Sequence, residues 1–140
     1  MSILDLLDTE AQSESGAWLH LTKPGTTKQR LYLDDDPDKP VRIKTKGPDS
    51  ETWTSFMRKS AKEKADSADK SSAEVAMEDA RILARMTLAW ENLPVGDNGE
   101  PAPFDRDTAV EVYRKYKDMR MQLIHHILDR EAFFTERQDA

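Results

Sequence analysis

The stretch Asp34–Asp38 groups side-chain carboxylates closely enough to suggest a calcium site, because Pro37 is its one position without an aspartate. A calcium loop of the EF-hand type needs oxygen ligands at alternating positions, a glycine at the sharp turn and a distal glutamate. Pro37 and Lys39 interrupt this pattern, and no glycine follows. The stretch is therefore predicted to be a solvated acidic loop. Asp97–Glu100 includes a glycine but too few ligands, and is predicted to be a tight turn.

The histidines are His20, His125 and His126. Adjacent residues on a helix diverge by about 100°, so His125 and His126 cannot chelate a metal together as an i, i+4 pair does. We expect one of them to face water and the other to lie at the edge of the core. The sequence has no cysteine, no nucleophile elbow, no phosphate-binding glycine loop and no dinucleotide fingerprint. These patterns predict a protein without catalytic residues, cofactor or metal.

Basic residues gather in the stretch Arg58–Lys64, where they alternate with Glu63 and small polar residues. This pattern favours a mixed-charge helix surface over a phosphate site. The whole chain has a net charge of −6 and an isoelectric point of about 5.1. Phosphate binding needs a basic face, so nucleic acid is not an expected partner.

Large apolar side chains remain as candidates, either for packing or for anchoring a protein partner. Several of them flank the Pro-rich stretch between Trp90 and Phe104, which is predicted to connect two helices. The candidate residues are Trp53, Phe56, Trp90, Leu93, Phe104, Phe133 and Phe134.

The elements that must position these side chains begin with a β-rich part. Residues 1–16 are acidic and are predicted to form a flexible N-terminus; the alternative is a short apolar patch formed by Ile3, Leu4, Leu6 and Leu7. Three short strands are expected near residues 17–21, 30–33 and 41–46, separated by turns rich in Pro, Gly and Asp. The alternation in Val41–Lys46 would turn one side of its strand to the core and the other to water. Such a small sheet needs helices packed against it.

The helical part is expected from residue 49 to 134. Asp49 or Ser50 would cap a helix with an apolar stripe at Trp53, Phe56 and Met57, and residues 59–72 would be a solvated extension or a flexible connection. Ser71 or Ser72 would cap a helix over residues 74–92. Asp105 would cap a helical stretch that continues to about residue 134. Its apolar stripe would consist of Val112, Tyr116, Met119, Leu123 and Ile127. A break near Lys117 and Asp118 would divide the stretch into two shorter helices.

These elements predict an α+β fold: a small N-terminal antiparallel sheet followed by a mainly α-helical C-terminal half. Residues 17–140 would form a single domain, with a β-rich part at 17–48, a helical part at 49–134 and a polar tail at 135–140. The absence of cysteine, of a signal peptide and of a long apolar run leads us to expect a soluble cytosolic protein with no membrane contact. The apolar stripes of the 51–64 and 74–92 helices would allow a homo-oligomer.

Short sequence patterns near the C-terminus resemble those of one protein family. Trp90-Glu-Asn-Leu is followed by Asp97-Asn-Gly-Glu-Pro-Ala-Pro-Phe104-Asp, a helix, and Ile127-Leu-Asp-Arg-Glu-Ala-Phe-Phe134. This order is similar to that of tail assembly chaperones from long-tailed (siphovirus-type) bacteriophages and prophages. Their β-rich start is similar to Leu19-His-Leu-Thr-Lys-Pro-Gly, Lys39-Pro-Val-Arg-Ile and Gly47-Pro-Asp-Ser50 followed by Trp53. The family often has a proline within the last helical stretch, where this chain has Lys117-Asp118-Met119.

The resemblance implies a function and its partners. Such chaperones bind the tape measure protein and help to recruit tail tube subunits during tail assembly, without catalysis. They act in the host cell cytoplasm and are not expected in the mature virion. A minor structural protein of the phage particle, in the tail or the connector, is the alternative left open.

Overall fold

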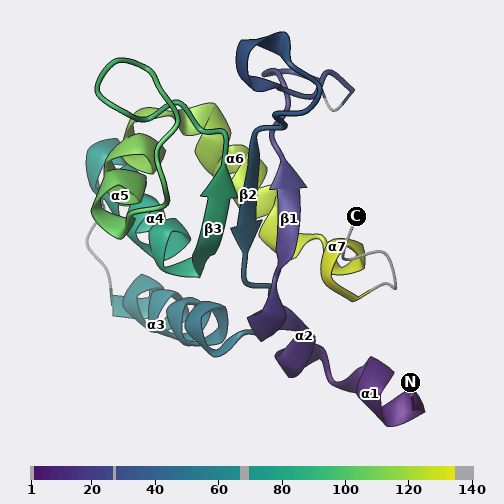
Figure 1. Ribbon diagram of the computed structural model, residues 1–140. Coiled ribbons are helices and arrows are strands. Elements are labelled where there is room, and N and C mark those ends of the chain that lie inside the picture. Colours follow the sequence, from purple (N-terminus) through teal and green to yellow (C-terminus); the bar gives the residue numbers. More distant parts are fainter. Residues whose placement is uncertain (1, 27, 67–69, 135–140) are drawn as a thin grey trace.

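The computed structural model describes residues 2–26, 28–66 and 70–134, which form two layers, a small sheet and a set of helices (Figure 1). The sheet is antiparallel in the order β1-β2-β3, with bounds Ala17–His20, Arg42–Thr45 and Thr87–Glu91. The helices are α1 (Ile3–Leu7), α2 (Thr9–Ser15), α3 (Glu51–Asp66), α4 (Ser72–Met86), α5 (Arg106–Lys115), α6 (Lys117–Leu128) and α7 (Arg130–Phe134). The predicted α+β class with a small antiparallel sheet is confirmed.

The third strand comes from a segment that was expected to be helical. The prediction of one helix over residues 74–92 is wrong beyond Met86, because Thr87–Glu91 forms β3 and pairs with β2. Thr87 ends the helix: its hydroxyl donates to the carbonyl of Leu83 at 2.8 Å, four residues back. A threonine that bonds backward in this way competes with continuation of the helix.

The segment between β1 and β2 does not form the strand predicted near residues 30–33. It contributes isolated bridges, Thr22 with Arg30 and Tyr32 with Pro40, and a short 3-10 turn at Leu33–Asp35. Asp34 and Asp35 both adopt positive φ angles, 54° and 56°, which strands do not contain. Because Arg30 and Tyr32 take part only in isolated bridges, the strand prediction here is wrong, and the segment extends beyond the end of the sheet as an excursion (Figure 1).

Two short helices, α1 and α2, lie within residues 1–16, the segment that was predicted to be a flexible N-terminus. Ser2 caps α1 with a reciprocal capping box, and Asp8 caps α2. Ser13 is fully buried, and its carbonyl and hydroxyl oxygens accept the backbone N–H groups of Gly47 and Asp49. The N-terminal segment is thus joined to the sheet-to-helix connection.

The predicted helix starts around residues 50, 71 and 105 are confirmed. The Ser50 hydroxyl accepts the N–H of Trp53, the Ser71 hydroxyl that of Glu74, and the Asp105 carboxylate that of Thr108. Helix α3 continues to Asp66 as the polar extension that was expected. The predicted end of that polar stretch includes residues 67–69, which lie outside the described residues, as does the predicted polar tail at 135–140.

The predicted break near Lys117 is also confirmed, and it changes which residues of the last helices are buried. Tyr116 separates α5 from α6 with φ −107° and ψ 95°, and its side chain is 49% exposed. The expected stripe included Tyr116, but α5 instead buries Ala109 and Tyr113, while α6 buries Leu123 and Ile127 as predicted. The break at Tyr116 therefore puts the buried faces of α5 and α6 out of phase with each other.

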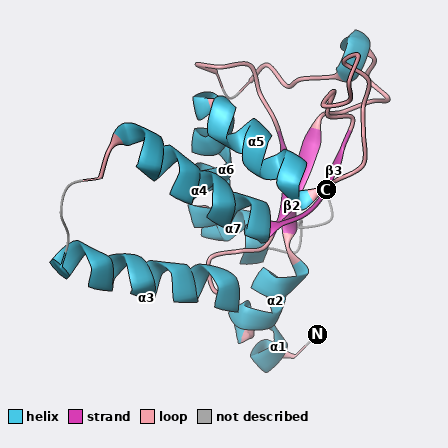
Figure 2. Cartoon of the chain, turned by 90° about the vertical axis from the view of Figure 1, so that its left-hand side faces the viewer, coloured by secondary structure: helices cyan, strands magenta, loops and turns pink. Residues whose placement is uncertain are grey.

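The core lies between the sheet and helices α4, α5 and α6. Figure 2 shows these helices on one side of the sheet, and in Figures 1 and 2 no helix of the described residues crosses its other side. The covered side holds Ile43 and Thr45 of β2, both fully buried, next to Trp90 of β3. The opposite side of the sheet is open.

Candidate protein-interaction surfaces

The predicted contact residues Trp90 and Phe104 form one aromatic cluster inside the fold. Their ring centroids are 5.0 Å apart and nearly perpendicular, and Tyr113 lies 6.4 Å from Trp90 in the same edge-to-face manner. The Trp90 indole N–H donates to the carbonyl of Ala102 at 2.8 Å, and Leu93 is buried beside it. The cluster thus fastens the 92–105 loop to the core, so Trp90 and Leu93 cannot contact a partner without unfolding this loop.

Trp53 and Phe56 form a second cluster at the base of α3, with their rings 5.5 Å apart. Trp53 is buried, whereas Phe56 is half-buried and lines a groove of about 340 Å³ between α3 and α4 together with Ile82. At the far end of the groove, the Lys70 ammonium lies 3.2 Å from Glu63 and 2.7 Å from Glu78. Lys70 therefore connects the end of α3 to α4.

Phe133 and Phe134 form a third cluster, next to α2. Phe133 is fully buried and its ring packs against His126 at 4.9 Å, while the guanidinium of Arg130 covers Phe134 at 4.7 Å. Arg130 also forms a two-pronged ion pair with Asp49, which lowers the pKa of that carboxyl. The predicted interaction residues thus occupy three separate places, and most of them support the fold.

The histidines lie as expected from the helix geometry, since His125 is exposed and His126 is buried. The His126 Nε2 lies 3.1 Å from the carbonyl of Ala17, and burial lowers the pKa of this side chain. Burial likewise raises the pKa of Asp79, a half-buried carboxyl on α4. Within the residues that the structure describes, no three His, Asp or Glu side chains meet in a group that could hold a metal ion.

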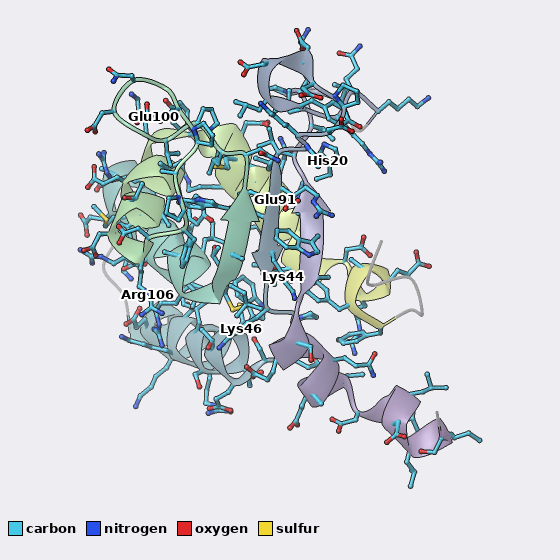
Figure 3. The ribbon with its side chains drawn as sticks, viewed as in Figure 1. His20, Lys44, Lys46, Glu91, Glu100 and Arg106 are labelled. Atoms are coloured by element: carbon cyan, nitrogen blue, oxygen red, sulfur yellow. The ribbon has the colours of Figure 1, made fainter. Side chains whose placement is uncertain are left out.

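The open side of the sheet carries a regular array of exposed and half-buried side chains. The strand register places Trp18, Lys44 and Ala89 in one row across the three strands, and His20, Arg42 and Glu91 in the next row. Figure 3 shows His20, Lys44 and Glu91 over the strands on this side. We call these six residues the open sheet face.

Aromatic and cationic groups meet at the centre of the open sheet face. The Arg42 guanidinium lies 4.5 Å from the centre of the Trp18 ring, and the Lys44 ammonium lies 6.0 Å from it. Arg42 is also paired with Glu91. His20 is directed to the end of the sheet, where its ring packs edge-on against Tyr32 at 4.9 Å.

Trp18 was not among the residues selected from the sequence, although one signal for it was present. The alternation in Val41–Lys46 predicts that Arg42 and Lys44 face away from the core, and the register then places Trp18 beside them. The register could not be read from the sequence, because the segment between the two strands is long and irregular.

Helix α1 is the most apolar exposed part of the described chain. Ile3, Leu4, Leu6 and Leu7 are 76%, 77%, 44% and 67% exposed, and no residue of this helix is buried. Figure 1 shows α1 projecting away from the rest of the molecule, beyond α2. None of the helices among the described residues combines the length and apolar character needed to cross a lipid bilayer.

Comparison with known proteins identified no matching family model, curated protein or solved structure.

Proposed function

We propose that this protein is a non-catalytic tail assembly chaperone that binds a phage tape measure protein and helps to recruit tail tube subunits. The observation that carries the proposal is the exposed apolar surface of α1. A chaperone that keeps a long, partly apolar helical client in solution must present apolar side chains to that client and remain soluble itself. The α1 helix has the first property, and the net charge of −6 provides the second.

The chemistry of α1 suits a helical client. Its four large aliphatic side chains are accompanied by Asp5 and by the capping residue Asp8, so the helix combines apolar contact with negative charge. An amphipathic helix binds by laying its apolar side chains against a complementary surface on its partner. Full burial of one leucine side chain contributes about 1.5–3 kcal/mol before ordering costs. Two leucines thus suffice for a binding difference on the order of a hundredfold.

The internal position of the other aromatic residues supports the same assignment. Trp90 and Phe133 pack the loop and the last helix into the fold from which α1 extends. These buried residues would stabilise the fold that carries the contact surface. In this proposal the client contacts α1 first, and the host cell cytoplasm is the place of action.

Co-expression with the tape measure protein of the same phage genome tests the proposal. The expected result is a larger soluble fraction of that protein and a complex that co-purifies with this chain. Replacing Leu4 and Leu7 by aspartate should abolish both effects. The matched control is Leu128→Asp, which makes the same change at a leucine of α6 that is 53% exposed. It should leave the complex intact.

Two results would contradict the proposal. One is the absence of a complex and of any solubility change with the unaltered chain. The other is equal binding by the unaltered chain and the Leu4→Asp, Leu7→Asp variant, which would separate α1 from the client. Circular dichroism of each variant checks that its fold is unchanged.

A further inference from the structure

The first part of the chain is both apolar and acidic, since no lysine or arginine occurs before Lys23. At 3.6 residues per turn, the large aliphatic side chains of α1 fall on one side of the helix, opposite Asp5. Asp8 and Glu10, both exposed, follow directly after this apolar side. We call residues 2–10 the N-terminal arm. It presents an exposed apolar helix side followed by two carboxylates.

The direction of the arm is fixed by α2. The side-chain amide of Gln12 donates to the carbonyls of Leu6 and Asp8, at 3.1 and 3.2 Å. Helix α2 is in turn joined to the start of α3, because the Glu14 carboxylate accepts the N–H of Glu51 at 2.8 Å. Figure 1 shows α1 and α3 extending from α2 in opposite directions. The arm therefore points away from α3 of its own chain.

The groove between α3 and α4, of about 340 Å³, has properties that complement those of the arm. Phe56 and Ile82 supply its apolar lining. Arg81 and Arg85, exposed and four residues apart on α4, line one side, and Lys59 of α3 lines the other. Such long cationic side chains place their methylene stems against apolar surface and keep their charged ends in water. We call this surface the α3/α4 groove.

The cations of the α3/α4 groove are not neutralised by its own carboxylates. Glu63 and Glu78 also line the groove, but both pair with Lys70, at 3.2 and 2.7 Å. The ion pairs formed among the described residues include none of the three groove cations Lys59, Arg81 and Arg85. These cations are therefore available to carboxylates from outside the chain.

We propose that the α3/α4 groove binds the N-terminal arm of a second copy of this chain. The apolar side of α1 packs on Phe56, on Ile82 and on the stems of the groove cations, and Glu10 pairs with the arginines of α4. Each copy has one arm and one groove, so two copies that exchange arms form both contacts in a symmetric dimer. This inference goes beyond the proposed function and does not rest on it, because self-association requires no tape measure protein.

Sedimentation equilibrium of the full chain tests the self-association. At low salt the mass should rise with protein concentration from 16.0 kDa toward that of a dimer, and added salt should shift the rise to higher concentration. The variant Leu4→Asp, Leu7→Asp should stay monomeric, whereas Leu128→Asp should associate like the unaltered chain. A mass of 16.0 kDa at every concentration up to millimolar would overturn the proposal.

A pair of charge reversals tests whether the arm and the groove are the two contacting surfaces. The variant Arg81→Glu, Arg85→Glu and the variant Glu10→Lys should each associate more weakly, on the order of tenfold or more. Asp8 is left unchanged because it caps α2. A mixture of the two variants should regain association, since a lysine arm then meets a glutamate groove and the unaltered arm meets the unaltered groove.

The matched control for the groove is Lys23→Glu, Lys28→Glu, which changes the charge equally on the excursion between β1 and β2, at the end of the sheet away from α3 (Figure 1). This control should associate like the unaltered chain. Equal association of the control and the groove variant, or a mixture no stronger than its separate components, would exclude the pairing of arm and groove.

A spin label separates a second copy from the chain's own arm. The sequence has no cysteine, so Ala11→Cys, at an exposed position of α2, provides a single attachment point for a nitroxide. In a mixture with isotope-labelled chain that has no nitroxide, the amide signals around Phe56 and Ile82 should broaden. Broadening at the groove only when both labels are in the same molecule would mean that the arm folds back, which contradicts the proposal.

The groove variant also separates this inference from the proposed function. Leu4→Asp, Leu7→Asp removes the side chains that both contacts use, whereas Arg81→Glu, Arg85→Glu leaves α1 unaltered. The groove variant should therefore lose self-association and still co-purify with the tape measure protein. Loss of the client with normal self-association of the unaltered chain would refute the chaperone proposal and leave the arm exchange in place.

Discussion

The buried hydroxyl pair at the junction of α4, β3 and α5 predicts that two conservative substitutions have unequal costs. The Thr87 Oγ1 atom lies 2.8 Å from the carbonyl of Leu83 and 2.8 Å from the hydroxyl of Tyr113. A carbonyl can only accept, so Thr87 donates its proton to Leu83, and Tyr113 must donate to Thr87. Tyr113 is fully buried, and Thr87 is 5% exposed.

The direction of donation sets the size of each effect. Tyr113→Phe removes a donor while Thr87 keeps its bond to Leu83, so the free energy of unfolding should fall by about 1 kcal/mol. Thr87→Val preserves the shape but leaves the Tyr113 hydroxyl buried without an acceptor, which should cost about 2 kcal/mol. The Leu83 carbonyl still accepts the backbone N–H of residue 87. In the double variant no hydroxyl is left without a partner, so its cost should be about 1 kcal/mol.

Urea unfolding of the four proteins, followed by tryptophan fluorescence and by circular dichroism, measures these differences. The double variant should be less destabilised than the sum of the two single variants, by on the order of 2 kcal/mol. Additive costs, or a larger loss for Tyr113→Phe than for Thr87→Val, would show that the donation runs the other way or that the pair is not buried in solution.

Three further perturbations test other parts of the structure. Burial lowers the pKa of His126 below its ordinary value of 6.5, so the unfolded chain binds a proton at this imidazole more readily than the folded chain does. The free energy of unfolding should therefore decrease as the pH falls through 6.5. The variant His126→Gln should flatten that part of a curve of unfolding free energy against pH. Gly47→Ala would place a methyl group 2.8 Å from the Phe133 ring, and urea unfolding should reveal a loss of about 1–3 kcal/mol. Trp90→Phe removes the hydrogen bond to Ala102, so hydrogen exchange in the 92–105 loop should accelerate; unchanged exchange would mean that the ring alone holds the loop.

The helix starts and the last helical break could be predicted from the sequence because their signals are local. A serine or aspartate at the first position of a helix binds backbone N–H groups only three residues away, as Ser50, Ser71 and Asp105 do. The α+β class followed from the same kind of signal, since short β-prone runs precede long stretches of helical period.

The third strand could not be predicted because its sequence satisfies two patterns. Over Thr87–Glu91 the apolar residues continue the helical spacing of Ile82 and Met86, but Leu88, Ala89 and Trp90 also form a short continuous apolar run, which fits a buried strand equally well. Tertiary contacts decide in favour of the strand over the helix. β3 pairs with the second edge of β2, and Trp90 then fills the core opposite Ile43. The phase of α5 was mispredicted for a related reason, because the break at Tyr116 rotates one helix against the next.

The α1 surface and the open sheet face were not selected from the sequence, because the type of a side chain does not reveal whether it is exposed. Seven large apolar residues were selected as packing or contact residues, and the structure buries Trp53, Trp90, Leu93 and Phe133. The exposed apolar residues of α1 had been assigned to a flexible end. Trp18 lies beside Lys44 only through a pairing of strands that are separated by an irregular excursion.

The burial of Phe133 against the first part of the chain has a consequence for synthesis. Ser13 bonds to Gly47, and a methyl group added at Gly47 would meet both the Ser13 hydroxyl and the Phe133 ring, so residues near both ends of the described chain share one site. Translation proceeds at about 5–20 residues per second, and contacts between distant residues form slowly. On the ribosome, the site around Ser13 and Gly47 therefore stays incomplete until Phe133 has been translated. During that interval Ser13 and Gly47 are open to a neighbouring nascent chain, so the rate of translation determines how long this site can form contacts that the finished fold excludes.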